Sequence, residues 1–388
     1  MKNYKMNFIE LQVTFSLFVV FLFRMLGMFM VLPVLSEYGM SFKDGSHFLV
    51  GLSIGIYGIT QVIFQVPYGI LSDKFGRKRL IILGLLMFLI GSFIAADTDS
   101  IWGIIVGRAI QGSGAISGVL MALLSDLIRE EHRVKAISAI GASFALSFLF
   151  SIVSGPLVFE YFGFFSIFWI SVFFSVLCIF TVIFFIPESK NIELQKNQYC
   201  SSKKSSIFFV RSKIFRCYLG IFCLHCLLMI NFMIIPHQLI LSGLSLNNHW
   251  KVYLSIIASS FIFLFFVVFF LKSKRILKNI IEICIFFIFC SFFILHACNK
   301  NLFVLICSLQ LFFIAFNLLE VFFPSFLNKE APISSRGRVM SIYSTSQFLG
   351  VFFGGVLSGW LCSFFDVSEI FLLETLFVLF WLMVSFFS

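Results

Sequence analysis

Long apolar segments, separated by short polar breaks, run along the whole chain. Most of them are about 17–25 residues long, which is the length that an α-helix needs to cross the hydrocarbon core of a bilayer. Backbone polar groups in lipid must be bonded within their own segment, and the strands of membrane barrels are shorter, so we predict helices. The twelve predicted helices cover residues 12–35, 47–71, 80–96, 101–124, 136–159, 163–187, 216–240, 250–271, 279–297, 302–327, 339–363 and 367–387.

The composition excludes a water-soluble protein. Of the 388 residues, 60% are hydrophobic and 12% are charged, whereas soluble domains have about 45–50% apolar and about 25% charged residues. The ten Cys residues all lie from Cys178 onward and mostly within apolar segments. Cysteines in that setting are typical of small apolar side chains, so we expect no disulfide framework.

The positive charges predict how the chain crosses the membrane. A net charge of +10 is compatible with nucleic-acid binding, but the Lys and Arg residues lie mainly in short loops between apolar segments. Of the 28, 23 lie at the N-terminus or in loops after even-numbered helices, while the opposite loops hold only Lys43, Lys251 and Lys300. Such a bias predicts that both termini lie in the cytoplasm, and we expect no nucleic-acid partner.

A weak internal repeat divides the chain into two halves. Residues 29–33 (FMVLP) recur as residues 232–236 (FMIIP), and the same shift of 203 positions carries Arg133 onto Arg336. Duplicated sets of six helices around a midplane site are one known plan of membrane transporters. We therefore predict an N-terminal six-helix half over 1–187, a basic cytoplasmic linker over 188–215, and a C-terminal six-helix half over 216–388.

The loop between the second and third helices carries a motif. Residues 69–79 read GILSDKFGRKR, and a generic cytoplasmic loop explains its cations but not the spacing of its glycines and Asp73. Gly69 and Gly76 would permit a tight turn, and Arg77 and its neighbours would anchor the loop at the cytoplasmic face. This run resembles the signature loop G-x-L-a-D-[RK]-x-G-[RK]-[RK] of the major facilitator superfamily.

The resemblance implies an all-α membrane protein with the major facilitator fold, a transporter and not an enzyme. It also implies that Asp73 is a latch holding the outward-open state, with Arg133 and the start of the eleventh helix near Arg338 as its partners. A carboxylate at a helix N-terminus is favourable on general grounds.

Two arginines lie inside predicted helices, where a charge is costly. Arg24 is in the middle of the first helix, so we expect a buried partner. Arg108 lies in residues 107–114 (GRAIQGSG), similar to the second family motif, R-x-x-q-G-x-g. Arg108 therefore either serves a cavity, including proton coupling, or extends toward the outer interface.

The tenth helix supplies a carboxylate. Gln310, Asn317 and Glu320 are spaced to share one helix face. In the family the first, fourth, seventh and tenth helices line the central cavity, so the resemblance places Arg24, Arg108 and Glu320 around it. Glu320 is our candidate proton carrier, and a structural ion pair between Glu320 and Arg24 is the alternative, which does not exclude the first.

The seventh helix holds His225 between Cys223 and Cys226. A Cys-x-x-Cys pair on a membrane helix, without a second ligand pair, does not indicate a metal site. We expect no metal and no cofactor, and we treat His225 as a candidate titrating group of the cavity.

The fifth helix bears on the direction of transport. Ser143, Ser147, Ser151 and Ser154 form a stripe of small residues that either admits another helix or lines a pore. Gly155 and Pro156 follow, similar to the start of the antiporter motif G-P-x-x-G-G, but the closing glycines are absent here.

More narrowly, residues 24–35, 100–105 and 343–350 resemble the YajR-type bacterial inner-membrane transporters. Those relatives carry a cytoplasmic domain after the last helix, which we do not expect here because the sequence ends at Ser388. With no Walker loop, we predict a monomeric secondary transporter of the inner membrane, in contact with lipid, that exports a small, amphipathic solute in exchange for protons. A proton-coupled importer and a non-transporting sensor or scaffold are the alternatives.

Overall fold

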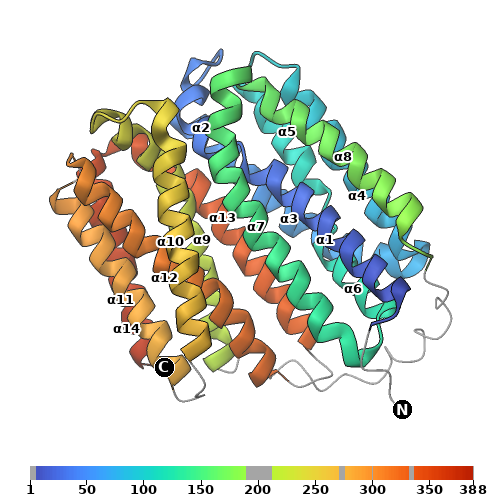
Figure 1. Ribbon diagram of the computed structural model, residues 1–388. Helices are drawn as coiled ribbons and strands as arrows, with labels where there is room; N and C mark the ends of the chain where they lie inside the picture. Colours follow the sequence, from blue (N-terminus) through green and yellow to red (C-terminus); the bar gives the residue numbers. More distant parts are fainter. Residues whose placement is uncertain (1–5, 189–211, 271–275, 299, 332–335, 388) are drawn as a thin grey trace. The chain divides into compact units, whose positions relative to one another are not determined.

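The computed structural model describes residues 6–188, 212–270, 276–298, 300–331 and 336–387, and Figure 1 shows its helices. Twelve of its helical segments are long and apolar enough to cross a membrane, which confirms the twelve predicted spans. Most of the predicted linker 188–215 lies outside the described residues, so its structure is not considered further.

Contacts group the chain into two compact units. The first comprises residues 1–34, 42–44 and 56–203, and the second comprises residues 35–41, 45–55 and 204–388. This grouping differs from the predicted halves because two short pieces of the predicted N-terminal half, 35–41 and 45–55, belong to the second unit. The division into two six-helix halves stays a prediction.

The first six spans are built from eight α-helices and one 3₁₀ helix of the described chain. They are α1 (Phe8–Phe29), α2 (Leu32–Tyr38), η1 (Gly39–Ser41), α3 (His47–Phe75), α4 (Arg77–Ala96), α5 (Ile101–Ser113), α6 (Ser117–Leu127), α7 (Glu130–Phe162) and α8 (Phe165–Phe185).

The remaining six spans are each built on one α-helix, and a short 3₁₀ helix precedes the second of them. They are α9 (Ser212–Leu241), η4 (Leu246–Asn248), α10 (His249–Phe270), α11 (Ile276–Ala297), α12 (Leu302–Glu330), α13 (Arg336–Phe364) and α14 (Val367–Phe387).

Two spans of the first half are interrupted. The first breaks between α1 and α2, just before Pro33, which has no backbone N–H to continue the helical bonds. The fourth breaks between α5 and α6 at residues 114–116. There a Cβ on Gly114 would clash with the Gly84 carbonyl of α4, so the glycine permits the close approach of α4. Each break leaves helix carbonyls without intrahelical partners inside the membrane.

The two units repeat one packing plan. In the first, α1 packs on α7 and α4 packs on α8; in the second, the corresponding pairs are α9 with α13 and α11 with α14. Equivalent helices therefore have equivalent neighbours, as expected if the halves arose by duplication.

The serine stripe of α7 is a packing face. Ser143 and Ser147 donate to carbonyls of their own helix, and the Ser151 hydroxyl lies 2.6 Å from the Ser147 carbonyl of α7 and 3.0 Å from the Leu26 carbonyl of α1. A Cβ on Gly155 would clash with the carbonyl of Met30, the residue directly after α1. Small residues here let α1 and α7 approach closely, so of the two alternatives for the stripe the structure favours helix contact.

Candidate functional site

The motif loop is a single sharp turn between α3 and α4. Gly76 has φ +96°, a backbone conformation that favours glycine, and α4 begins at the next residue. Gly69, in contrast, lies within α3, and nothing approaches the position of its absent Cβ. The expectation that both glycines make the turn is therefore wrong for Gly69, because α3 continues through Phe75.

Arg77, the first residue of α4, organises this turn. Its Nη1 lies 2.6 Å from Asp73 Oδ1 and donates to Ser72 Oγ at 2.8 Å. Its Nε lies 3.1 Å from Asp126 Oδ2, at the end of α6. The turn is thus fastened to α6 through one guanidinium between two carboxylates, an arrangement in which charge-assisted hydrogen bonds are strong.

The other predicted latch residues lie elsewhere in the chain. Arg133, near the start of α7, donates from Nε to the Ile128 carbonyl at 3.1 Å. Arg338 belongs to α13 in the second unit and is exposed. Pairing of Asp73 with these groups stays a prediction, while its ion-pair contact in this structure is with Arg77.

Arg24 is buried in the first unit, with 2% of its surface exposed. Its guanidinium donates to Ser117 Oγ at 3.1 Å, Gln61 Oε1 at 3.0 Å and the Gly114 carbonyl at 2.6 Å. Gly114 follows the last residue of α5, where the helix dipole is negative. The buried partner expected for Arg24 is therefore the interrupted end of α5 together with two polar side chains.

Arg108 of α5 is fully buried. Its Nη1 lies 3.2 Å from Gln111 Oε1 and 3.4 Å from the Met28 carbonyl near the end of α1. Its Cζ lies 5.0 Å from the centre of the Tyr57 ring, whose face attracts a cation. Gln111 in turn donates to Ser92 of α4 at 2.8 Å. The Arg108 side chain is therefore enclosed by neighbouring helices and does not extend to the outer membrane–water interface.

The second unit holds a cluster of three polar side chains on three helices. His225 Nε2 of α9 lies 3.3 Å from Glu320 Oε1 of α12 and 2.9 Å from Gln347 Nε2 of α13. His225 Nδ1 lies 3.3 Å from the Ile221 carbonyl, and the Phe316 ring packs beside the imidazole. The structure thus brings together His225 and Glu320, which were predicted separately. That Glu320 also shares a cavity with Arg24 and Arg108 stays a prediction, because these arginines belong to the first unit.

The cluster can hold one proton in two forms. With Nδ1–H directed at Ile221 and Gln347 donating to Nε2, the imidazole is neutral and Nε2 presents its lone pair. In this first form the proton lies on Glu320 and faces the nitrogen. In the second form the proton lies on Nε2 and faces the Glu320 carboxylate, and the Gln347 amide must then present its oxygen in place of its N–H. When that proton leaves, a carboxylate faces a lone pair at 3.3 Å, which is unfavourable, so the pair is responsive to proton uptake and release.

Two neighbours on α12 were predicted to share this face. Asn317 is buried, and its Nδ2 has no hydrogen bond within the described residues. Gln310 instead contacts α10, where it bonds Ser259 at 2.8 Å and Ser260 at 3.1 Å. Gln310 therefore does not belong to the Glu320 cluster.

Several hydrogen-bond and ion-pair partners were not predicted from the sequence. Glu10 of α1 accepts from the Nε, Nη2 and backbone N of Arg129, between α6 and α7, at 2.8–3.1 Å. Its only sequence signal is the capping box that it forms with Asn7. Asp126 and Gln347 gave no signal by spacing, because their partners Arg77 and His225 lie 49 and 122 residues away.

No group of three or more His, Cys, Asp or Glu side chains suited to a metal ion occurs in the described part of the chain. Cys223 and Cys226 are buried in α9 as free thiols. These residues therefore give no support to a metal site.

Comparison with known proteins gives consistent matches. The family model of the Major Facilitator Superfamily matches residues 17–332. The chain is 61% identical over 350 residues to an uncharacterized transporter of Buchnera aphidicola subsp. Acyrthosiphon pisum (strain APS), with 90% of each chain covered. It is 42% identical over 385 residues to the inner membrane transport protein YajR of Escherichia coli (strain K12), covering 99% of this chain and 85% of that protein. Among solved structures, a D-xylose-proton symporter shares the fold with a TM-score of 0.76, 14% identity and 97% of each chain covered.

Proposed function

The chain belongs to the major facilitator superfamily of membrane transporters, and from this premise we propose that it is a proton-coupled secondary transporter of a small organic solute. The family consists of transporters and not enzymes. The observation that carries the proposal is the pair formed by His225 and Glu320, whose facing atoms lie 3.3 Å apart within membrane-spanning helices.

A charged Arg, Lys or Asp side chain costs about 2.5–3.5 kcal/mol at the centre of a span, and ionisable residues within spans therefore mark functional pathways by default. In alternating access, two halves rock around a central site and expose it to each side in turn. Proton binding shifts such an equilibrium only if the two states bind the proton with different affinity. The His225–Glu320 pair supplies a group whose contacts depend on a proton, and Gln347 of α13 ties it to a third helix.

We propose efflux by exchange for protons as the direction. Gly155 and Pro156 support it through their likeness to the start of the antiporter motif, and Gly155 lies against the Met30 carbonyl beside the break of α1. We also propose a bacterial inner-membrane location with both termini in the cytoplasm, from the distribution of Lys and Arg.

The test is proton movement in liposomes that contain the purified full chain and a pH-sensitive dye. Amphipathic cations, organic anions, sugars and amino acids are added one by one under an imposed pH gradient. Proton movement triggered by a solute, in the sense of exchange, supports the proposal; cotransport in the same direction would show an importer. Solute transport without proton movement would overturn the coupling. If folded protein moves neither solute nor protons across the panel, the proposed function is contradicted in favour of a sensor or scaffold.

A further inference from the structure

Two short pieces of the second unit belong by sequence to the predicted N-terminal half. They are residues 35–41 at the end of the first span and residues 45–55, which contain the start of the second span. The first piece contacts α9 through Glu37, and the second piece contacts α13 through two glycines. Alternating access moves two halves against each other, so these contacts must open and close if the proposed transport takes place.

The contact between α3 and α13, called here the glycine interface, is formed by Gly51, Gly55, Gly355 and Gly359. A Cβ on Gly55 would lie 2.7 Å from the Phe352 carbonyl oxygen, and a Cβ on Gly355 would lie 2.6 Å from the Gly55 backbone nitrogen. A Cβ on Gly51 would clash with the Gly355 carbonyl. Small residues spaced four apart let two helix backbones pack closely in a membrane. Glycines carry no side-chain charge, so the interface closes by shape and does not itself respond to protons.

A titratable pair joins α2 to α9. The Oε1 atom of Glu37 lies 3.5 Å from His237 Nδ1, and the His237 side chain is 57% exposed. His237 precedes the end of α9 by four residues, or about 6 Å, so the imidazole lies near the boundary between membrane and water. An imidazolium Nδ1–H donates to the carboxylate across opposite charges, whereas a neutral imidazole forms no ion pair. The contact therefore strengthens when His237 binds a proton.

Other titratable groups near this pair lie on α10 and α3. Tyr253 of α10 is buried and lies within electrostatic range of Glu37, and the buried His249 ring packs edge-on against Tyr253. His47, at the start of α3, is exposed and forms no ion pair among the described residues. Residues 344–361 of α13 include no ionisable side chain. The imidazole of the pair is thus the exposed group in contact with Glu37 that is of a type able to change charge between about pH 5 and 8.

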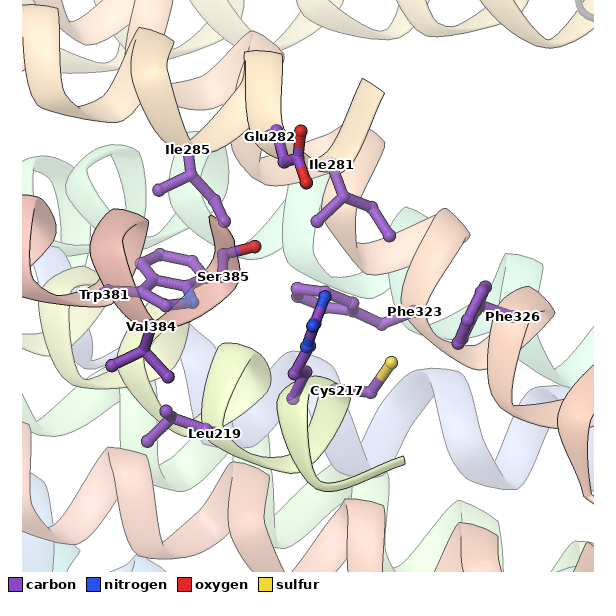
Figure 2. A pocket seen from close by; sticks show the side chains of 11 residues that line it. Cys217, Leu219, Ile281, Glu282, Ile285, Phe323, Phe326, Trp381, Val384 and Ser385 are labelled. Carbon is purple, nitrogen blue, oxygen red and sulfur yellow. The ribbon is translucent and has the colours of Figure 1, made fainter. Parts of the chain in front are cut away.

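The pair is separate from the other features of this unit. A cavity of about 260 Å³ is lined by other residues of α9, α11, α12 and α14, and Figure 2 shows the Trp381 indole and the Phe323 ring turned toward it. His237 follows His225 by twelve residues in α9, which is about 18 Å along the helix. A proton on His237 is therefore distinct from the proton of the His225–Glu320 pair.

We propose that the Glu37–His237 pair is a second proton-binding site, which holds the glycine interface closed when His237 is protonated. Both contacts join the predicted N-terminal half to the predicted C-terminal half, so a proton that strengthens the pair favours the closed state. The distribution of Lys and Arg predicts that this end of the spans faces the outer solution, which supplies the proton. The role in transport rests on the proposed function: closing the outer side after a proton binds there agrees with efflux by exchange for protons.

The first experiment measures the separation across this contact at two pH values. Spin labels are attached at the exposed positions Ser41 and Leu241 of the full chain in nanodiscs, through an unnatural ketone side chain so that native thiols stay unlabelled. We expect the ratio of shorter to longer distances to rise by up to about fivefold from about pH 8 to about pH 5, the effect of an exposed ion pair. Glu37→Gln and His237→Gln should each remove this response. His237→Lys, whose cation persists at both pH values, should keep the shorter distance at both.

Lys251→Gln is the matched control, because it removes an exposed cation near the start of α10 and leaves the pair intact. It should respond to pH as the unsubstituted protein does. An equal response in His237→Gln and Lys251→Gln, or no response in the unsubstituted protein, would overturn the proposal. A response that Glu320→Gln loses and His237→Gln keeps would also overturn it, while leaving the proposed function intact. The distances are measured without solute or transport, so they do not depend on the proposed function.

A second measurement tests the glycine interface with the same labels. Gly355→Ala places a methyl group against the Gly55 backbone and should favour the longer distance at both pH values. Gly118→Ala is the control, because nothing lies within 4 Å of its Cβ position. If folded Gly355→Ala shows the same distances as Gly118→Ala, the glycine interface does not define the closed state and the proposal is wrong.

Discussion

Arg24 and Arg108 each donate a hydrogen bond to the interrupted end of the other's helix. Arg24 of α1 reaches the Gly114 carbonyl just beyond α5 at 2.6 Å, and Arg108 of α5 reaches the Met28 carbonyl near the end of α1 at 3.4 Å. Helix carbonyls that lack intrahelical partners are costly in lipid, and cations are favourable at the negative end of a helix dipole. Each buried guanidinium thus supplies a donor to one helix break, and none of their hydrogen-bond acceptors in the described part of the chain is a carboxylate.

This arrangement predicts that neither arginine can be replaced by lysine without loss of stability. Arg24→Lys removes at least one of three hydrogen bonds to Gln61, Ser117 and Gly114, and each bond from a charged donor contributes roughly 1–3 kcal/mol. We expect a lower midpoint of thermal unfolding in detergent, while exposed Arg79→Lys leaves it unchanged. An unchanged midpoint for Arg24→Lys would show that the break of α5 needs no guanidinium.

The two arginines should also be energetically coupled. Their helices support each other's ends, so the double variant Arg24→Lys/Arg108→Lys should differ from the sum of the single effects by about 0.5 kcal/mol or more. Strict additivity, measured on the same unfolding curves, would count against the reciprocal arrangement.

A third prediction concerns the proton pair. Replacing Glu320 with Gln keeps a hydrogen-bonding side chain next to His225 but removes the titrating oxygen, so solute transport should no longer depend on the pH gradient. Glu160→Gln, at an exposed position of α7, is the control. Membrane insertion should be equal in all three proteins, and a proton-to-solute ratio that survives in Glu320→Gln would remove Glu320 from the mechanism.

The spans could be predicted from the sequence because their length and polarity are set by the bilayer and not by tertiary contacts. The hydrogen-bond partners of the buried polar side chains could not be predicted, because folding brings together residues that are far apart in the sequence. Arg24 needs a broken helix end that lies 90 residues away, and His225 needs Gln347 from a helix 122 residues further on. Helical periodicity also placed Gln310 with Glu320, whereas the hydrogen bonds of Gln310 to Ser259 and Ser260 show that it faces α10.

A fourth prediction tests the latch at its observed contacts. Arg77 bridges Asp73 and Asp126 in this structure, so removing either carboxylate charge should loosen the turn between α3 and α4 from α6. We expect Asp73→Asn and Asp126→Asn to change the labelling of single cysteines from the two sides of the membrane in the same direction. Exposed Asp99→Asn is the control. An effect of Asp73→Asn without any effect of Asp126→Asn would indicate that Asp73 acts through another partner, such as Arg133 or the helix that begins near Arg338.

The two glycines of the motif should respond to alanine with opposite signs. Gly76 has φ +96°, where a side chain costs roughly 1–3 kcal/mol, so Gly76→Ala should lower the midpoint of thermal unfolding and disturb the Arg77 contacts that follow the turn. Gly69 lies in the interior of α3 with open space around its Cβ position. There alanine restricts the unfolded chain and should stabilise the helix by roughly 0.5–1 kcal/mol. The measurement compares the midpoints of thermal unfolding of the two variants with that of the unsubstituted protein in the same detergent. Equal destabilisation by both would mean that Gly69 is needed for a close approach in another conformation of the transport cycle, because its backbone in this structure imposes no such need.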